Sequence, residues 1–503
     1  MQIGWLQIIM SVVYLGILVA VGLIMSKKVK SSDDFWVGGR EVGPVATALS
    51  YAAAYVSTVA IIGDPPMYYN YGLGYAGFEM ACSVLMCTIV IFVAFAPKMR
   101  ALSERLNVVS LSGFLAVRYK SNKFRILCGT LVAVMMIPYA ISAMNGIANT
   151  MTSIANIPYV IGVLIIAAVV FLYLVTAGYW GVATTDIIQG ITIAISCLIV
   201  AVIVTVKAGG VSNIVSTMKA IKPSHVTASS GMSFSTLFSW AGVWAFIAFG
   251  QPQLITKFMG LKDSRTVGTV MRVSVAWEIV FMIAIILMGG SAFVLYNGVP
   301  FENSDMIVPV LVSDHTSKFV SGLFICGILA AGLSTVCALI LTSASSVAKD
   351  IYEDYTSAKT GKVPDGKKSI KVSRIVTGIV LAIVVIGAIY PPDFIWSLST
   401  MSAGVMGAAF TAPLLLGLYW KRATKPGCFA AIIGGSIVSI VWYLAGLTSI
   451  VHSFVPGTVV SFILLIMVSL LTPAMPKEHV DVFFNPECSQ ENIDAAIASG
   501  NVG

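Results

Sequence analysis

The stretch SYAAAYVSTVAIIGDPPMYYNYGLGY, residues 50–75, decides the fold class. It is long and apolar enough to cross a bilayer, yet it carries Gly63, Asp64, Pro65 and Pro66 at membrane depth. Proline removes a backbone donor and glycine accepts unusual dihedral angles, so a helix interrupted here frees carbonyls for a bound ion or solute. A simple proline kink would leave the same pattern. The choice between the two interpretations depends on the rest of the chain.

The composition of the whole chain agrees with a membrane protein. Of its 503 residues 58% are hydrophobic and only 10% are charged, whereas an ordinary soluble protein has about 25% charged residues. Much of the surface must therefore face lipid, and neither a soluble fold nor a nucleic-acid-binding protein is favoured. The eight cysteines and four histidines are scattered without a CxxC pair, a pattern that does not indicate disulfides or a catalytic metal.

Apolar runs of about 20 residues predict thirteen transmembrane helices. The first run lacks a basic start and a clear cleavage site, so we interpret it as a span and not as a signal peptide. Short loops join the runs, which predicts one transmembrane domain over residues 1–476 and a cytoplasmic tail over 477–503. The predicted spans are 4–26, 44–70, 76–96, 125–148, 157–178, 185–207, 236–258, 270–296, 318–346, 373–391, 396–420, 426–446 and 450–472.

The basic residues predict the orientation of these spans. If the odd-numbered connections and the tail face the cytoplasm, they hold 26 of the 30 lysines and arginines. The positive-inside rule then places the N-terminus outside and the C-terminus in the cytoplasm of a multi-pass cell-membrane protein. The net charge of +8 is thus mostly a record of topology.

Another predicted span is interrupted in the same way as the stretch at residues 50–75. The seventh span, WAFIAFGQPQLITKF, carries Gly250, Gln251 and Pro252. Spans two and seven lie five spans apart, so each can open a five-helix unit, and an odd number of helices gives the two units opposite orientations. Paired broken helices in inverted repeats indicate a transporter site. We therefore predict repeats at about 44–207 and 236–420, and prefer this interpretation to a proline kink.

The ninth span adds hydroxyl groups at the same depth. It contains Ala330-Ala331-Gly332-Leu333-Ser334-Thr335, in which small residues permit close approach of a neighbouring helix. Helix-to-helix hydrogen bonds alone would explain the two hydroxyls. Opposite a broken helix, however, hydroxyls and free carbonyls form a neutral oxygen cage suited to a hard monovalent cation.

Few charged residues fall inside the predicted spans. Asp64 precedes Pro65 and Pro66, so it either caps the second half-helix or binds a substrate amine, a sodium ion or a proton. Asp186 lies at the predicted cytoplasmic start of span six, where it would cap the helix or guide an outgoing cation. Glu79 and Glu278 fall near span ends and are interpreted as interfacial.

From residue 33 to the end of span twelve the chain resembles the sodium:solute symporter family. The stretch GLYWKRATKPGCFAAIIGG (417–435) follows the second family signature, with Cys428 where alanine is usual. GQPQLITKFM (250–259) and AGVMGAAFTAP (403–413) are similar to two further family segments. The first signature fits less well, because Ala177, Gly178 and Tyr179 replace its usual residues.

The resemblance implies an all-α inverted-repeat fold of the leucine-transporter type, with sodium between the broken second span and the ninth. It implies that Ser57 is the next candidate in the broken helix and that Asp186 is the acid near the inner exit. The sodium ligands that it implies are the carbonyls of Ala53, Val56 and Ala331 and the hydroxyls of Ser334 and Thr335.

The resemblance leaves the solute open. Trp244 and Pro252 match positions that proline-transporting members use, but Ala248 stands where those members have an aromatic residue and Tyr55 where they have aspartate. Both departures argue against proline. The run YYNYGLGY (68–75) is similar to pantothenate and monocarboxylate carriers, although Asp64 would repel a carboxylate unless it were protonated or paired.

These observations favour sodium-coupled import of a small organic solute such as an amino acid, a carboxylate or a vitamin-like compound. We expect sodium as the coupling ion, no other cofactor, a solute site between Asp64, Tyr139, Trp244 and Gln251, and sodium release assisted by Asp186. Proton coupling through Asp64 is the alternative within the same fold. A membrane-embedded enzyme or sensor lacks support, because no histidines, cysteines or paired carboxylates cluster in the spans.

Overall fold

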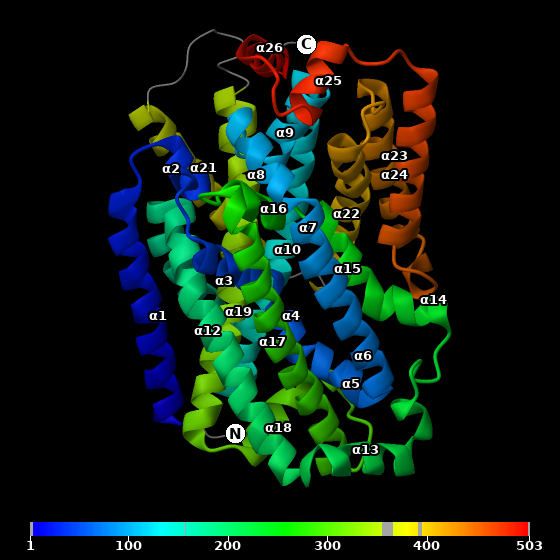
Figure 1. The fold of residues 1–503 in the computed structure, drawn as a ribbon. Coiled ribbons are helices and arrows are strands. Elements are labelled where there is room, and N and C mark those ends of the chain that lie inside the picture. The colour runs from blue at the N-terminus through cyan, green and yellow to red at the C-terminus, as the bar shows by residue number, and fades with distance from the viewer. Residues whose placement is uncertain (1–3, 156, 355–365, 391–394, 501–503) are drawn as a thin grey trace.

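The computed structural model describes residues 4–155, 157–354, 366–390 and 395–500. Within these ranges the secondary structure is helical apart from an isolated parallel bridge between Val42 and Leu261. The all-α prediction is therefore confirmed. The helices form an elongated bundle, in which α1 starts near the end opposite to the one that carries α25 and α26 (Figure 1).

The first part of the chain runs from the peripheral helix α1 to the long kinked helix α12. Its elements are α1 (Trp5–Met25), η1 (Ser26–Lys28), α2 (Ser32–Val37), η2 (Gly38–Arg40), α3 (Pro44–Tyr55), α4 (Thr58–Ile62), α5 (Asp64–Tyr71), α6 (Leu73–Cys82), η3 (Ser83–Val90), α7 (Ile91–Ala94), α8 (Ala96–Arg105), α9 (Leu111–Arg118), α10 (Asn122–Ala155), α11 (Tyr159–Val170), η4 (Phe171–Val175) and α12 (Thr176–Lys207).

The second part contains the other broken helix and the tail. Its elements are α13 (Gly210–Ile221), η5 (Pro223–Val226), α14 (Phe234–Leu237), η6 (Phe238–Gly242), α15 (Val243–Ile247), η7 (Ala248–Gly250), α16 (Pro252–Met259), η8 (Ser264–Thr266), α17 (Val267–Leu295), η9 (Ser304–Met306), α18 (Ile307–His315), α19 (Lys318–Ser345), η10 (Ser346–Asp354), α21 (Gly366–Ile389), α22 (Ile395–Tyr419), α23 (Lys425–Leu444), η11 (Leu447–Ser449), α24 (Phe454–Leu471), α25 (Lys477–Phe484) and α26 (Gln490–Gly500).

The described residues contain ten helices long and apolar enough to cross a membrane, or eleven if the bent pair 44–71 is one span. The count differs from thirteen for two reasons. Residues 159–207 form one continuous helical segment where we expect spans five and six, with a kink at Gly178 (φ 52°, ψ −136°). The seventh span contributes only a shorter apolar helix, residues 234–250. The thirteen spans and the inverted repeats therefore stay predictions.

The second span is broken at a different residue from the one that the sequence indicates. The main break lies at Val56 and Ser57, where both residues are extended and the flanking helices bend by 65°. Gly63 keeps right-handed helical angles (φ −93°, ψ −35°), so α4 and α5 continue almost in line. Prolines in a first helical turn need no hydrogen-bond donor, and for this reason Pro65 and Pro66 are tolerated without a break.

The seventh span breaks where the sequence indicates. Gln251 is extended (φ −86°, ψ 108°) between η7 and α16, and Pro252 opens the following helix. Each broken helix therefore has extended backbone between two half-helices: two residues in the second span and one in the seventh. Val56 and Gln251 are 2% and 4% exposed, so the freed backbone groups lie inside the protein, as membrane proteins require.

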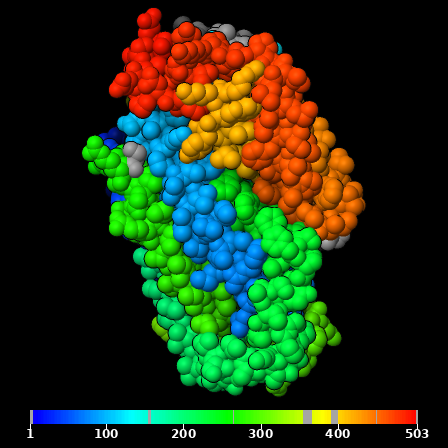
Figure 2. All heavy atoms as spheres, turned by 45° about the vertical axis from the view of Figure 1, so that its right-hand side comes forward, coloured from blue at the N-terminus to red at the C-terminus, as the bar shows by residue number. Residues whose placement is uncertain are grey.

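Helix α19 forms the centre of the bundle. In its apolar window 94% of the residues are buried, against 22% in the window of α1. α19 packs against α1, α3, α10 and α12, whereas α1, α23 and α24 present exposed leucine, isoleucine and valine side chains. Such a surface fits lipid. Figure 2 shows α23, α24 and the tail covering one side and one end of the molecule.

The C-terminal tail forms two helices that dock on the bundle. Arg105 of α8 donates hydrogen bonds to the carbonyls of Val482, Asn485 and Pro486 at 2.9, 3.0 and 2.9 Å. The ring of His479 lies 3.2 Å from the carbonyl oxygen of Arg118, and burial lowers the pKa of this histidine to about 4. The tail is thus tied to α8 and α9.

Candidate functional site

The break in the second span exposes backbone carbonyls to the central helix. α3 ends at Tyr55, and the extended angles of Val56 and Ser57 take the carbonyls around Val56 out of the helical hydrogen-bond pattern. α19 passes this point with Ser334 and Thr335, which are 0% and 2% exposed. Two segments distant in sequence therefore meet with oxygen atoms on both sides.

All five predicted ion ligands come together at this point. The hydroxyl of Ser334 donates to the carbonyl of Ala53 at 2.7 Å and to that of Ala331 at 3.0 Å. The hydroxyl of Thr335 lies 3.4 Å from the carbonyl oxygen of Val56 and 3.0 Å from that of Ala331. Three carbonyls and two hydroxyls form a neutral oxygen cage, which suits a hard monovalent cation better than a transition metal. Among the described residues no group of three or more His, Cys, Asp or Glu side chains could hold a metal ion.

Small residues allow the two segments to approach so closely. A side-chain carbon added to Gly332 would lie 2.6 Å from the hydroxyl of Thr58 and 2.1 Å from Ile147. The hydroxyl of Ser57 caps α4 by accepting a hydrogen bond from the backbone N–H of Val59 at 3.2 Å. Thr58, which the sequence interpretation missed, is 3% exposed and its hydroxyl has no hydrogen-bond partner. In the sequence, the position of Thr58 directly after Ser57 was the signal that could have identified it.

Three of the four predicted solute residues lie around α22. The side-chain amide of Gln251 donates to the carbonyl of Ala403 at 3.3 Å. Tyr139 and Trp244 are partly buried against a small apolar cluster of Val243, Ile247, Ala403 and Phe454. The ring of Trp244 also meets that of His452 edge-on, with centroids 5.9 Å apart. The residues come from α10, α15 and the break before α16.

Asp64 is not joined to this group. It is the first residue of α5, which packs against α4, α6, α17 and α18. The N-cap position belongs to Gly63, and no side-chain hydrogen bond caps the helix. The structure therefore offers no hydrogen bond for the capping interpretation, and within the described residues no hydrogen bond or ion pair joins Asp64 to Tyr139, Trp244 or Gln251.

Asp186 lies in a buried ion pair. It is 0% exposed inside α12, and its carboxylate is 3.0 Å from the ammonium group of Lys257, which is 2% exposed. Lys257 also donates to the hydroxyl of Ser50 at 2.6 Å, and Ser50 donates to Asp186. One expectation is corrected: Asp186 is no helix cap, because it is the eleventh residue of α12.

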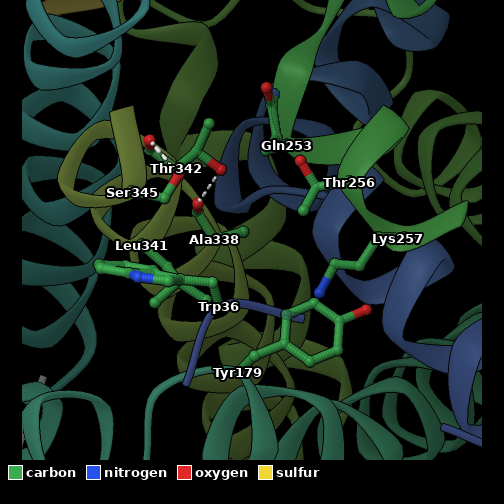
Figure 3. A pocket seen from close by; sticks show the side chains of 9 residues that line it. All are labelled: Trp36, Tyr179, Gln253, Thr256, Lys257, Ala338, Leu341, Thr342 and Ser345. Atoms are coloured by element: carbon green, nitrogen blue, oxygen red, sulfur yellow. Dashed lines mark hydrogen bonds between the residues drawn. The ribbon is translucent and has the colours of Figure 1, made fainter. Parts of the chain in front are cut away.

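A small cavity of about 10 Å³ borders Lys257, which is room for about one water molecule. Figure 3 shows the ammonium group of Lys257 beside the ring of Tyr179, with Trp36 and Gln253 at the edges; the ammonium nitrogen lies 5.3 Å from the centre of that ring. Ala338, Leu341, Thr342 and Ser345 of α19 line the other wall. Ala338 is one helical turn beyond Thr335, so the cavity lies next to the oxygen cage.

Glu278 is also buried, against the prediction that it is interfacial. It is 4% exposed within α17, and its carboxylate accepts hydrogen bonds from Ser83 and Thr88. The hydroxyl of Ser83 lies 3.0 Å from that of Tyr55. The position of Glu278 nine residues inside the predicted span 270–296 was the signal for burial. Glu79 is partly buried in α6.

The fold and this site define a polytopic membrane protein in which two broken helices and a central helix surround buried oxygen ligands. The model of the sodium:solute symporter family matches residues 35–435. The chain therefore belongs to the sodium:solute symporter family, as its motifs predict, and so to a family of transporters and not of enzymes.

Similar proteins agree with this assignment. The osmoregulated proline transporter of Bacillus subtilis is 26% identical over 95% of this chain and 97% of its own. The sodium/proline symporter of Staphylococcus aureus is 27% identical over 93% of each chain. Among solved structures, a Na⁺-coupled sialic acid symporter in a substrate-bound outward-open state is 19% identical, with a TM-score of 0.80 over 94% of this chain and 99% of that one. This likeness shows that the fold is shared.

Proposed function

We propose that the chain imports a small organic solute together with sodium by alternating access. The single observation that carries this proposal is the oxygen cage, in which Ser334 of α19 reaches the carbonyl of Ala53 across 281 residues of sequence. The family of the chain and its Na⁺-coupled structural neighbour support the same coupling ion.

The cage would couple ion binding to the position of the helices. In the structure the hydroxyls of Ser334 and Thr335 point their protons at the carbonyls of Ala53, Val56 and Ala331. A bound sodium ion would take these carbonyls and the hydroxyl lone pairs as ligands, so the protons would turn away. Because the ligands belong to the broken helix and to α19, the ion holds the two elements together and orders the break.

The solute would bind beside the break of the seventh span, at Gln251. Tyr139, Trp244 and Gln251 offer a phenol, an indole and an amide near the extended backbone of residue 251, a mixture of apolar faces and few polar groups typical of small-molecule sites. The relatives named as proline transporters make proline the first compound to test. Tyr55 and Ala248 depart from the proline-transporting pattern, so amino acids, carboxylates and vitamin-like compounds belong in the same panel.

One sodium ion per solute is an adequate driving force. Moving one positive charge inward gains about 2.3 kcal/mol per 100 mV of membrane potential. A tenfold solute gradient costs about 1.4 kcal/mol. Asp186 would assist sodium release, but its pairing with Lys257 at 3.0 Å means that this pair must first separate or share the ion.

Uptake in proteoliposomes tests the proposal. Purified protein is given radiolabelled amino acids, carboxylates, sugars and vitamins with and without a sodium gradient. We expect one class to accumulate only with sodium, and the double variant Ser334→Ala, Thr335→Ala to lose most of that uptake. The matched control is Ser343→Ala, which removes a hydrogen bond from α19 to the carbonyl of Ala133 at 2.9 Å without touching the cage.

The outcomes separate the alternatives. Full sodium-dependent uptake by the double variant would place the ion elsewhere. Uptake that persists in sodium-free buffer and follows the pH gradient would favour proton coupling, and loss of this uptake in Asp64→Asn would assign it to that residue.

A further inference from the structure

Asp186 and Glu278 are two of the carboxylates buried inside the helical bundle, and they have different partners. Asp186 has a cation of its own, because Lys257 lies 3.0 Å away and both side chains are almost fully buried. Glu278 is 4% exposed and forms no ion pair in the part of the chain that the structure describes. A buried carboxylate without a cation is costly in a membrane. Glu278 is therefore an acid that a bound proton would stabilise.

The partners of Glu278 are hydroxyls that can reverse direction. Ser83 donates to one carboxylate oxygen and Thr88 to the other. Between Ser83 and Tyr55 either hydroxyl can be the donor, at 3.0 Å. A carboxylate only accepts hydrogen bonds, whereas a carboxylic acid also donates one. The hydrogen bonds along Tyr55, Ser83 and Glu278 can thus all be donated toward the carboxylate or all be donated away from it.

The backbone builds this arrangement with a distortion. η3 is a π-helix over Ser83–Val90, and Ser83 and Thr88 lie five residues apart, the spacing of the π-helical hydrogen bond. Both hydroxyls therefore reach the same carboxylate of α17. π-helical turns inside α-helices are frequently found at functional sites.

The other end of the chain of hydroxyls is at the ion cage. Tyr55 is the last residue of α3 and directly precedes Val56, whose carbonyl lies 3.4 Å from the Thr335 hydroxyl. The titratable groups that face Glu278 are the phenols of Tyr51 and Tyr55 from α3 and the thiol of Cys87 from η3. In the described residues packed around this stretch of α17, the groups acting on Glu278 are the hydroxyls of Ser83 and Thr88 and include no charged side chain.

We infer that the carboxyl group of Glu278 is a proton-binding site whose occupancy sets the direction of the Tyr55 hydroxyl at the break of the second span. Without a proton, Glu278 accepts from Ser83 and Ser83 accepts from Tyr55. With a proton taken from water, Glu278 donates to Ser83, Ser83 donates to Tyr55, and the Tyr55 proton is free to turn to another acceptor at the break. This inference rests on the proposed transport function for its effect on uptake, but not for the protonation itself.

The first test measures the proton directly. Infrared difference spectra of the purified protein, recorded while the pH is raised, report the C=O stretching band of a protonated carboxylic acid. We expect a band that disappears at high pH and is missing in Glu278→Gln, while Glu302→Gln, which changes an exposed acid, keeps it. A spectrum in which Glu278→Gln retains every titrating band would overturn the inference, whatever the protein transports.

The second test measures the effect on uptake at a fixed sodium gradient. We expect wild-type uptake to fall as the pH rises, because the Tyr55 proton turns inward. Glutamine donates to Ser83 as the protonated acid does, so Glu278→Gln should keep sodium-dependent uptake and lose its pH dependence. Ser83→Ala breaks the chain of hydroxyls but leaves the carboxyl group, and should lose the pH dependence while keeping the infrared band. This second variant keeps the test decisive if Glu278→Gln fails to fold.

The two measurements separate the possible failures. If uptake needs no sodium but the infrared band behaves as expected, the proposed coupling ion is wrong and the proton site stands. If uptake is sodium-dependent and both variants keep the wild-type pH profile, the proposed function stands and the role of Glu278 is refuted.

Discussion

At the scale of single residues, the neutral cage and the charged pair follow opposite principles. Ser334 and Thr335 are hydroxyls that each satisfy a carbonyl already within reach, so burial in the bundle leaves no charge unpaired. Asp186 and Lys257 must neutralise each other, since breaking a buried pair leaves one uncompensated charge. The oxygen ligands of the cage carry no net charge with or without an ion, whereas the pair cannot lose a member without leaving a charge buried.

Removal of one partner of this pair is expected to destabilise the protein. Lys257→Met leaves the buried carboxylate of Asp186 without a cation, which lowers the free energy of unfolding by roughly 3–5 kcal/mol. The variant should therefore unfold at a lower temperature in detergent. The double variant Lys257→Met, Asp186→Asn removes both charges and should recover most of the loss. Lys219→Met at an exposed lysine is the control. Equal unfolding temperatures for the single and double variants would show that the pair is not energetically coupled.

Sequence reasoning named the five cage oxygens but missed Lys257 and Glu278. The cage could be predicted because hydroxyls and small residues in an apolar run are unusual, and because the family motifs locate them. Lys257 closes a stretch, GQPQLITKF, that was interpreted only for its helix break. A lysine near a predicted span end has the same sequence signature whether it faces water or a buried aspartate.

At the scale of helices, the position of the break depends on capping more than on proline. Ser57 accepts a hydrogen bond from the N–H of Val59 and so begins α4, while Pro65 and Pro66 lie in a first turn that needs no donors. A serine before an apolar run is a weaker sequence signal than Gly-Asp-Pro-Pro. For this reason the sequence indicates a break in the second span but misplaces its largest bend.

The seventh span depends on a glycine at the contact with α22. A side-chain carbon added to Gly250 would lie 2.7 Å from the Cα of Gly407 and 2.9 Å from the carbonyl oxygens of Gly407 and Met406. Backbone atoms cannot move aside, so Gly250→Ala should cost roughly 1–3 kcal/mol, measured by thermal unfolding. Gly378→Ala, in α21 with nothing within 4 Å, should cause no loss. Equal stability of both variants would contradict the packing of η7 on α22.

At the scale of the whole molecule, the orientation in the membrane stays a prediction from the basic residues. α9 and α13 lie at opposite ends of the bundle (Figure 1). In a background without the partly exposed Cys82 and Cys488, we expect Lys219→Cys to react with a membrane-impermeant thiol reagent on intact cells. Lys120→Cys should react only after permeabilisation. Both side chains are exposed, so the reverse pattern would place the N-terminus in the cytoplasm.

The amino-acid sequence by itself determined the class of the protein and the two broken spans, because these follow from apolar run length, local breakers and motifs within short segments; the resemblance to the family indicated the oxygen atoms that meet between α3 and α19. Only the tertiary structure decided that Asp186 pairs with Lys257 and that Glu278 faces Ser83, Thr88 and Tyr55. Asp186 and Lys257 are 71 positions apart in the sequence, and Ser83 and Glu278 are 195 positions apart. The partner of a buried charge is therefore set by helix packing and not by its neighbours in the chain.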